Sequence, residues 1–231
     1  KLLTPRRRHP AAWVYTSTFG GGMVAGDRTH LDMTLHAGAR CVLTTQASSK
    51  VYRDPEKKGC RQSLSVEVAE EALVVVAPDP ITCYADAIFQ QRQDFQLAAT
   101  SSLVIVDWLT SGRRGYGEAW DFSSYQSRID VHRGEQHLLA DALLLDPETG
   151  PLDGSFRLGR FHCLGLMVLA GPQVETAAAA LAAELVARPV EREAELIEAV
   201  SPHDWGAVYR LAGISTQLVA DRLRQRLSWL E

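Results

Sequence analysis

A glycine-rich stretch directly before an alternating segment constrains the fold of this chain more than any other feature. It opens with three consecutive glycines and continues to a glycine–acid step, so that it contains Gly20, Gly21, Gly22, Gly26 and Asp27. Glycine clusters suit backbone that takes a positive φ or approaches another segment closely. Because residues 31–36 then alternate between apolar and polar side chains, the stretch is predicted to lead into a strand, as an elaborate turn or a contact surface.

Alternation with a period of two recurs along most of the chain and predicts a mainly β fold. Strands are expected over residues 12–17, 31–36, 40–45, 63–68, 73–76, 89–97, 102–106, 127–131, 136–145, 161–169 and 207–212. Helical spacing of apolar residues predicts two helices in the last third, over 171–188 and 216–230, while 191–200 is ambiguous. Such a series of short strands favours a sandwich, a barrel or a helical winding of strands, in a single domain over residues 1–231.

The composition argues against several classes of protein. A net charge of −4 disfavours a strongly electrostatic nucleic-acid binder, and no apolar run approaches the roughly 18 residues of a membrane span. The basic residues 6–9 are interpreted as a solvated arm, the alternative being a binding arm. No CxxC spacing occurs among the four cysteines, which are expected to be free thiols in a reducing cytoplasm: Cys41, Cys60, Cys83 and Cys163.

The glycine triplet raises one enzymatic alternative. Residues 20–25 match the GxGxxA pattern of dinucleotide-binding loops, which would make the protein a nucleotide-dependent oxidoreductase. Such a loop must lead into a helix whose N-terminus holds the pyrophosphate, so a strand after Ala25 would exclude it. No GxSxG, HExxH or P-loop motif is present, and no catalytic residues are assigned.

A polar run after the second alternating segment supports two interpretations. It is either a strand leaving the sheet or an exposed ledge with a tyrosine–arginine anchor, a composition typical of protein interfaces. Its candidate contact residues are Thr44, Thr45, Gln46, Lys50, Tyr52 and Arg53. A second glycine-rich turn adds four candidates: Gly112, Arg113, Gly117 and Glu118. In that turn Glu118 is expected to pair with Arg113 or Arg114, the alternative being an exposed acid.

Two further hypotheses concern ligands. Asp27 and His30 are candidates for part of a metal site, because imidazole ligands suit nickel or zinc. The seven histidines are otherwise scattered, and His30 and His36 are interpreted as solvent-facing side chains of one strand. A β-rich module that binds carbohydrate or peptide is a second alternative; it predicts one groove lined by the aromatic residues Trp108, Tyr116 and Trp120.

The stretch from Phe19 to Arg53 resembles the signature of the urease accessory proteins called UreD or UreH. The matching blocks are FGGGMVAGD, a strand, a Gly-Ala pair and LTTQASSKVYR. Three later blocks resemble the family in the same order: the proline-rich step at 77–81, the GR-x-x-GE turn at 111–118, and AVYRLAGIS before the last helix. Phe19 stands where the family usually has proline, and the family's first strands are expected to precede Lys1.

The resemblance implies both a fold and a function. The fold is a two-layered, β-helix-like winding of strands with a few helices. The implied protein is a non-catalytic maturation factor that binds apo-urease subunits and the helical accessory protein UreF, and the GTPase UreG joins this assembly. Nickel would be in transit to the urease active site, through a channel in the scaffold, and no tightly bound cofactor is expected. Nucleic acid and membranes are not expected partners.

Overall fold

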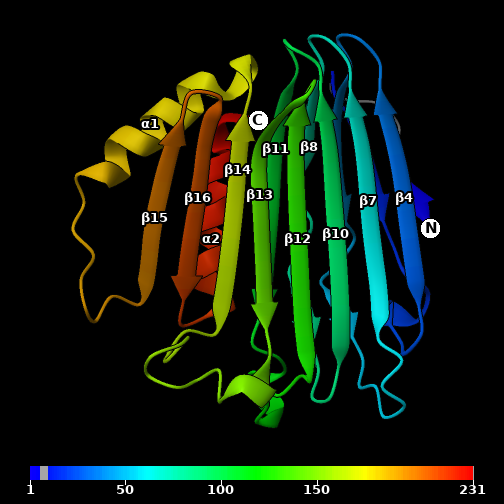
Figure 1. Cartoon of the computed structure of the whole chain (residues 1–231), viewed down its shortest axis with the longest axis vertical. Helices are drawn as coiled ribbons and strands as arrows, with labels where there is room; N and C mark the ends of the chain where they lie inside the picture. Colours follow the sequence, from blue (N-terminus) through cyan, green and yellow to red (C-terminus); the bar gives the residue numbers. More distant parts are fainter. Residues whose placement is uncertain (6–9, 231) are drawn as a thin grey trace.

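A computed structural model describes residues 1–5 and 10–230 of the chain. The basic arm expected at residues 6–9 lies outside this described part. The described residues are mainly β, wound as a β-solenoid-like arrangement of about 4 turns, with two α-helices in the C-terminal part (Figure 1). The expected fold class is therefore confirmed. Within the same residues, no helix is long and apolar enough to cross a membrane.

A five-stranded sheet forms the wall that faces the viewer in Figure 1, in the order β13-β12-β10-β7-β4. Its strands are β4 (Arg28–Leu35), β7 (Cys60–Val68), β10 (Ile88–Leu97), β12 (Ser124–Arg133) and β13 (Gln136–Leu145). The strands β4, β7, β10 and β12 pair in parallel, as strands related by one solenoid turn must. β13 returns antiparallel to β12 as the second strand of a hairpin.

An 11-stranded sheet forms the opposite wall, along the path β1-β2-β5-β8-β11-β14-β16-β15. The strands of this path are β1 (Leu2–Leu3), β2 (Ala12–Thr16), β5 (Arg40–Thr45), β8 (Leu73–Val76), β11 (Ser102–Thr110), β14 (Cys163–Ala170), β15 (Leu196–His203) and β16 (Gly206–Gly213). Three short strands lie off the path: β3 (Gly22–Met23), β6 (Ser49–Val51) and β9 (Ile81–Cys83). They pair in parallel, and β9 also pairs with the end of β11, so they form a short third wall.

Stacked turns at the upper end of Figure 1 hold successive coils in register. Gly38 N donates to Glu70 O at 2.9 Å, and Ala98 N donates to Val68 O at 2.9 Å. The φ of 68° at Gly38 explains why glycine occupies the middle of the expected turn at 37–39. Each turn therefore satisfies backbone groups of the next one, which an isolated turn would leave to water.

The two helices cover the face of the large sheet that points away from the small sheet. They are α1 (Glu175–Val186) and α2 (Thr216–Leu227), and single 3₁₀ turns occur at Phe19–Gly21, Arg114–Tyr116, Pro147–Thr149, Pro172–Val174 and Ser228–Leu230. Leu181 and Leu185 of α1 and Val219 and Leu223 of α2 pack on β14 and β16 in one apolar cluster. Ser215 caps α2 by accepting a hydrogen bond from Leu218 N at 3.3 Å. The ambiguous segment 191–200 contains most of the edge strand β15.

Three apolar clusters fill the interior. One lies between the two sheets and includes Phe95 and Ile105, a second lies under the helices, and a third at the lower end includes Phe89. The four cysteines are free, as expected, and all of them are buried. Burial is the main cause that raises the pKa of Cys60 and of Cys163 to about 12, so these thiols carry little thiolate at neutral pH.

Several strands are longer than their apolar alternation predicts. β7 begins at Cys60 instead of residue 63, β12 begins at Ser124 instead of 127, and β11 continues to Thr110 instead of ending at 106. Parallel backbone pairing with β10 continues through the first residues of β7 and β12, and the end of β11 pairs in parallel with β9 at Leu109 and Thr110. The apolar–polar alternation of the sequence indicates which face of a strand is buried. Backbone hydrogen bonding to the neighbouring strands determines where the strand ends.

Candidate functional site

The sequence blocks singled out above occupy the same place on successive coils. Gly22 is paired with Lys50, Lys50 with Thr82, and Thr82 with Thr110. The chain leaves this third wall after Met23, Val51, Cys83 and Ser111, so the residues that follow these positions lie side by side. Blocks separated by about 30 residues in the sequence therefore form one continuous surface at the lower end of the solenoid. We call the surface formed by residues 20–27, 50–54, 82–86 and 111–118 the motif end.

Gly22 is required by close packing at the motif end. A Cβ atom built on it would lie 2.7 Å from Lys50 O and 2.7 Å from Cε2 of Tyr52. Gly20 and Gly21 have no neighbour within 4 Å of such an atom, but their φ angles are 72° and 74°. The triplet thus combines a left-handed turn with a close approach of two coils, the two uses of glycine that the sequence predicted.

Aromatic and guanidinium groups form a ladder across the coils. The Tyr52 and Tyr84 rings meet edge to face with centroids 5.3 Å apart, and Tyr52 Oη donates to Gly20 O at 3.0 Å. The Arg113 guanidinium lies 4.0 Å from the Tyr84 ring centroid and 5.0 Å from that of Tyr116. Tyr116 ends the ladder with 81% of its surface exposed. An exposed tyrosine backed by an arginine is a typical interface anchor.

An ion pair fixes the turn that carries this ladder. Arg113 Nε donates to Glu118 Oε2 at 3.0 Å, and Ala85 N donates to the same oxygen at 3.3 Å. The hydrogen bond from Arg113 is the main cause that holds the pKa of Glu118 below its ordinary value. Gly112 and Gly117 take positive φ angles of 123° and 82° on either side of the pair. The prediction that Glu118 pins this turn is therefore confirmed, with Arg113 as its partner.

One part of the polar run at residues 44–53 fits a strand leaving the sheet, and another part fits an exposed ledge. Thr44 Oγ1 donates to Ala77 O at 2.7 Å, and Thr45 Oγ1 accepts from Asp79 N at 2.8 Å, so both hydroxyls bind the next coil. These contacts fit a strand leaving the sheet. By contrast, the polar side chains left exposed are those of Gln46, Lys50 and Arg53. Partner contact by this exposed part stays a prediction.

Asp27 and His30 have separate partners. Asp27 Oδ2 accepts from Val24 N at 2.9 Å, which closes the turn before β4. His30 Nδ1 lies 2.6 Å from Ser63 Oγ, and its Nε2 lies 2.9 Å from Asp32 Oδ1. The two side chains do not belong to a common group of three or more metal-ligating residues in the described part of the chain. His30 and His36 are both exposed, as predicted.

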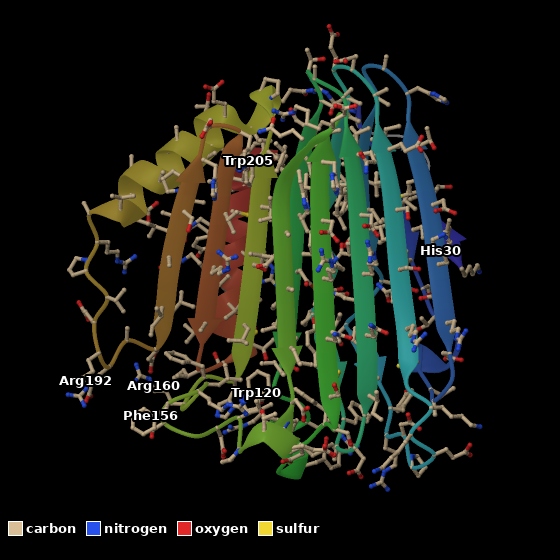
Figure 2. All side chains as sticks on the ribbon, in the orientation of Figure 1. His30, Trp120, Phe156, Arg160, Arg192 and Trp205 are labelled. Atoms are coloured by element: carbon tan, nitrogen blue, oxygen red, sulfur yellow. The ribbon has the colours of Figure 1, made fainter. Side chains whose placement is uncertain are left out.

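A loop beside the motif end presents a residue that the sequence did not single out. Phe156 is fully exposed, between β13 and β14. Arg157 Nη1 donates to Gly150 O at 2.6 Å, Arg160 Nη2 donates to Ala194 O at 2.6 Å, and Trp120 Nε1 donates to Phe161 O at 3.1 Å. Figure 2 shows Phe156, Arg160 and Trp120 together at the lower end. The only signal in the sequence is an apolar residue inside a loop that contains several glycines and two arginines.

The structure overturns both alternative functions drawn from the sequence. After Ala25 the chain turns and enters β4, so no helix follows the glycine triplet, and the dinucleotide loop is excluded. Trp108 and Trp120 are buried in two different apolar clusters, at 8% and 3% exposure. The groove of Trp108, Tyr116 and Trp120 that a carbohydrate- or peptide-binding module needs does not form, because apolar packing takes two of the three rings.

The sequence is similar to those of several known proteins. A family described as "UreD urease accessory protein" matches residues 1–231. A urease accessory protein UreD of Sorangium cellulosum is 46% identical over 231 residues, which cover 100% of this chain and 72% of that protein. A UreD of Anaeromyxobacter is 39% identical, and the match covers 100% of this chain and 77% of that protein. Urease accessory protein D of Arabidopsis thaliana is 34% identical, and the match covers 100% of this chain and 88% of that protein.

Proposed function

Because this chain belongs to the UreD family of urease accessory proteins, we propose that it is a non-catalytic scaffold that binds apo-urease and other accessory proteins. Membership supports a role in urease maturation. The proposed step is assembly of a complex in which nickel reaches the urease active site, with a UreF-like helical protein as a direct partner and a UreG-like GTPase joining through the complex. A cytoplasmic location, expected from the free thiols, is part of this proposal.

The observation that carries the proposal is the convergence of the motif blocks on one rigid end. The backbone there is fixed by inter-coil hydrogen bonds, for example Tyr52 N to Met23 O at 2.9 Å and Tyr84 N to Val51 O at 2.9 Å. Rigid presentation lowers the entropy lost on association. The exposed groups are aromatic and cationic, which suits a protein partner better than a small substrate.

A cavity between the two sheets supports the idea that nickel passes through the scaffold. Its volume is about 520 Å³, and its lining comes from β11 to β16. Asp107 lies in this lining, where Gln91 Nε2 donates to its Oδ1 at 2.7 Å and Ser127 Oγ donates to its Oδ2 at 2.9 Å. Arg210 Nη2 and Asp141 Oδ1, 2.8 Å apart, link the two sheets across the same cavity. Carboxylate oxygens within a cavity are groups that a divalent cation would bind in passing.

Binding to apo-urease and to a UreF-like partner tests the proposal. Tyr116→Ala combined with Arg53→Ala should weaken the complex about tenfold or more, because both side chains are exposed and interface anchors of these types carry much of the binding energy. Tyr52 is left intact because its hydroxyl and ring support Gly20 and Tyr84. The measurement is co-purification followed by titration of the dissociation constant.

A matched control replaces exposed residues far from the motif end. Val186→Ala with Arg224→Ala removes one apolar and one cationic side chain, at α1 and α2, and should leave binding unchanged. Equal binding by the wild type and the Tyr116/Arg53 variant would refute the motif end as a docking surface. Failure of the wild-type chain to bind either partner would refute the scaffold role itself.

A further inference from the structure

A histidine pair and a buried carboxylate meet at the β12–β13 hairpin, away from the motif end. The His132 and His137 rings are stacked, with centroids 4.2 Å apart and planes 7° apart. His137 Nε2 lies 3.1 Å from Asp130 Oδ1. One ligand atom from each of the three residues lies within 4.8 Å of the others, and no other such group of three occurs in the described residues.

An irregularity in the hairpin produces this arrangement. β12 and β13 pair regularly up to Val131, where Leu139 is the partner, and the register then shifts so that His132 faces His137 directly. Bulges of this kind re-aim side chains and are frequent next to functional sites. The shift places both imidazoles on the outer face of the sheet, the face that also carries Asp130.

The carboxylate is held in place before any ligand arrives. Arg128 donates from Nε to Asp130 Oδ2 at 2.7 Å and from Nη2 to Oδ1 at 2.8 Å, and Arg92 Nη2 lies 3.5 Å from Oδ2. These arginines and His137 leave the Asp130 side chain only 4% exposed, although it belongs to the solvent-facing side of β12. Oδ1 is the oxygen turned toward the histidines, and the His137 side chain remains 42% exposed.

We propose that Asp130, His132 and His137 bind one borderline divalent transition-metal ion, of the class of Ni²⁺ and Zn²⁺. Two imidazole nitrogens and one carboxylate oxygen match the ligand preference of these ions, and water completes the coordination. Because a bound ion lies in the plane of each imidazole, one of the two stacked rings rotates out of the stack when the ion binds. Arg128 acts as the outer partner that orients the ligating carboxylate. The two guanidinium charges repel the cation, so the site suits reversible loading rather than permanent structural binding. The inference stands apart from the scaffold role, because it rests on this hairpin alone.

Metal titration of the untagged protein tests the site. Ni²⁺ and Zn²⁺ are titrated separately by calorimetry, and Co²⁺ is used as a spectroscopic probe of nitrogen and oxygen ligation. His132→Ala with His137→Ala should remove one equivalent of bound metal or weaken its binding at least about tenfold. Loss of a residue that only hydrogen-bonds to a metal ligand already lowers metal affinity by about that factor. The Co²⁺ absorption bands should disappear with it.

The control and the contradicting outcome use histidines at another strand of the same sheet. His30→Ala with His36→Ala removes two exposed imidazoles, one on β4 and one directly after it, and should leave metal binding unchanged. The single variant His137→Ala is tested as well, in case the double variant misfolds. The thermal unfolding midpoint of this single variant is compared with that of the wild type. The same stoichiometry and affinity in the wild type and in a folded His132/His137 variant would overturn the proposal, as would equal loss in the β4 control.

Discussion

Gly22→Ala is expected to destabilise the protein by about 1–3 kcal/mol, the range typical of an atom forced into a packed site. The added Cβ would meet Lys50 O and Cε2 of Tyr52, each at 2.7 Å. The backbone oxygen cannot retreat freely, because Gly22 and Lys50 are paired in the ladder of β3 and β6. Gly22 has an extended φ of −175°, so the expected cost comes from the close approach and not from backbone strain.

Equilibrium unfolding in urea measures this cost, and neighbouring glycines supply the controls. Gly115→Ala adds a Cβ with no atom within 4 Å, so its effect should stay within about 0.5 kcal/mol. Gly20→Ala also enters open space but at a φ of 72°, which predicts an intermediate cost of about 1 kcal/mol. Equal stabilities for the Gly22 and Gly115 variants would show that the coils do not approach each other as described.

Glu198→Ala is the second large effect, with an expected loss of about 2–3 kcal/mol, because it leaves Tyr209 Oη without its acceptor and Arg226 paired with Glu184 alone. Glu198 Oε1 accepts from Tyr209 Oη at 2.7 Å and from Arg226 Nη2 at 3.1 Å, and Arg222 contacts its other oxygen. The side chains of Glu198 and Arg226 are only 5% and 10% exposed. The Glu198 carboxylate connects α2 to β15 and β16, so its loss should weaken the packing of α2 on the sheet.

The pH dependence of stability provides an independent test of the Glu198 network, because the direction of the pH effect can be predicted. Burial would raise the pKa of Glu198, but hydrogen bonds from Tyr209 and Arg226 and the charge of Arg222 outweigh it and lower the pKa below its ordinary value. The folded state therefore binds the proton more weakly than the unfolded state. The stabilisation is fully present above the unfolded pKa of about 4.3 and is lost as pH falls through the folded pKa.

Thermal unfolding between pH 3 and pH 7 separates Glu198→Ala from a matched surface change. Asp221→Ala breaks the exposed ion pair with Arg224 on the same helix and should cost no more than about 0.5 kcal/mol. The acid-side loss of stability should be smaller in Glu198→Ala than in the wild type, since the titrating group is gone. A Glu198 variant that is as stable as the Asp221 variant would contradict the account of this network.

Much of the fold follows from alternation in the sequence. β4, β5, β10 and β13 lie where period-2 runs predicted them, because each has one face against the core. β8 lies where a run of β-branched residues predicted a buried strand. Alternation specifies a face but not a neighbour. Which coil lies next to which depends on long-range pairing such as Gly22 with Lys50, and no local pattern encodes that register.

The individual motifs of the candidate site can be predicted from the sequence, but their assembly into one surface cannot. The motif residues were singled out, yet the contact between Tyr84 and Arg113 needs two coils that are about 30 residues apart in sequence. His132 and His137 looked scattered, because only a hairpin with a shifted register brings them face to face. Phe156 lies in an irregular loop, where periodicity carries no information.

Urease activation in a reconstituted mixture tests the central claim most directly. Apo-urease, nickel and the partner accessory proteins are combined with the wild-type chain, with the Tyr116/Arg53 variant, or with neither, and the rate of appearance of urease activity is measured. The scaffold account predicts fast activation with the wild-type chain and a rate with the variant close to that without the chain. Equal activation rates in all three mixtures would contradict it.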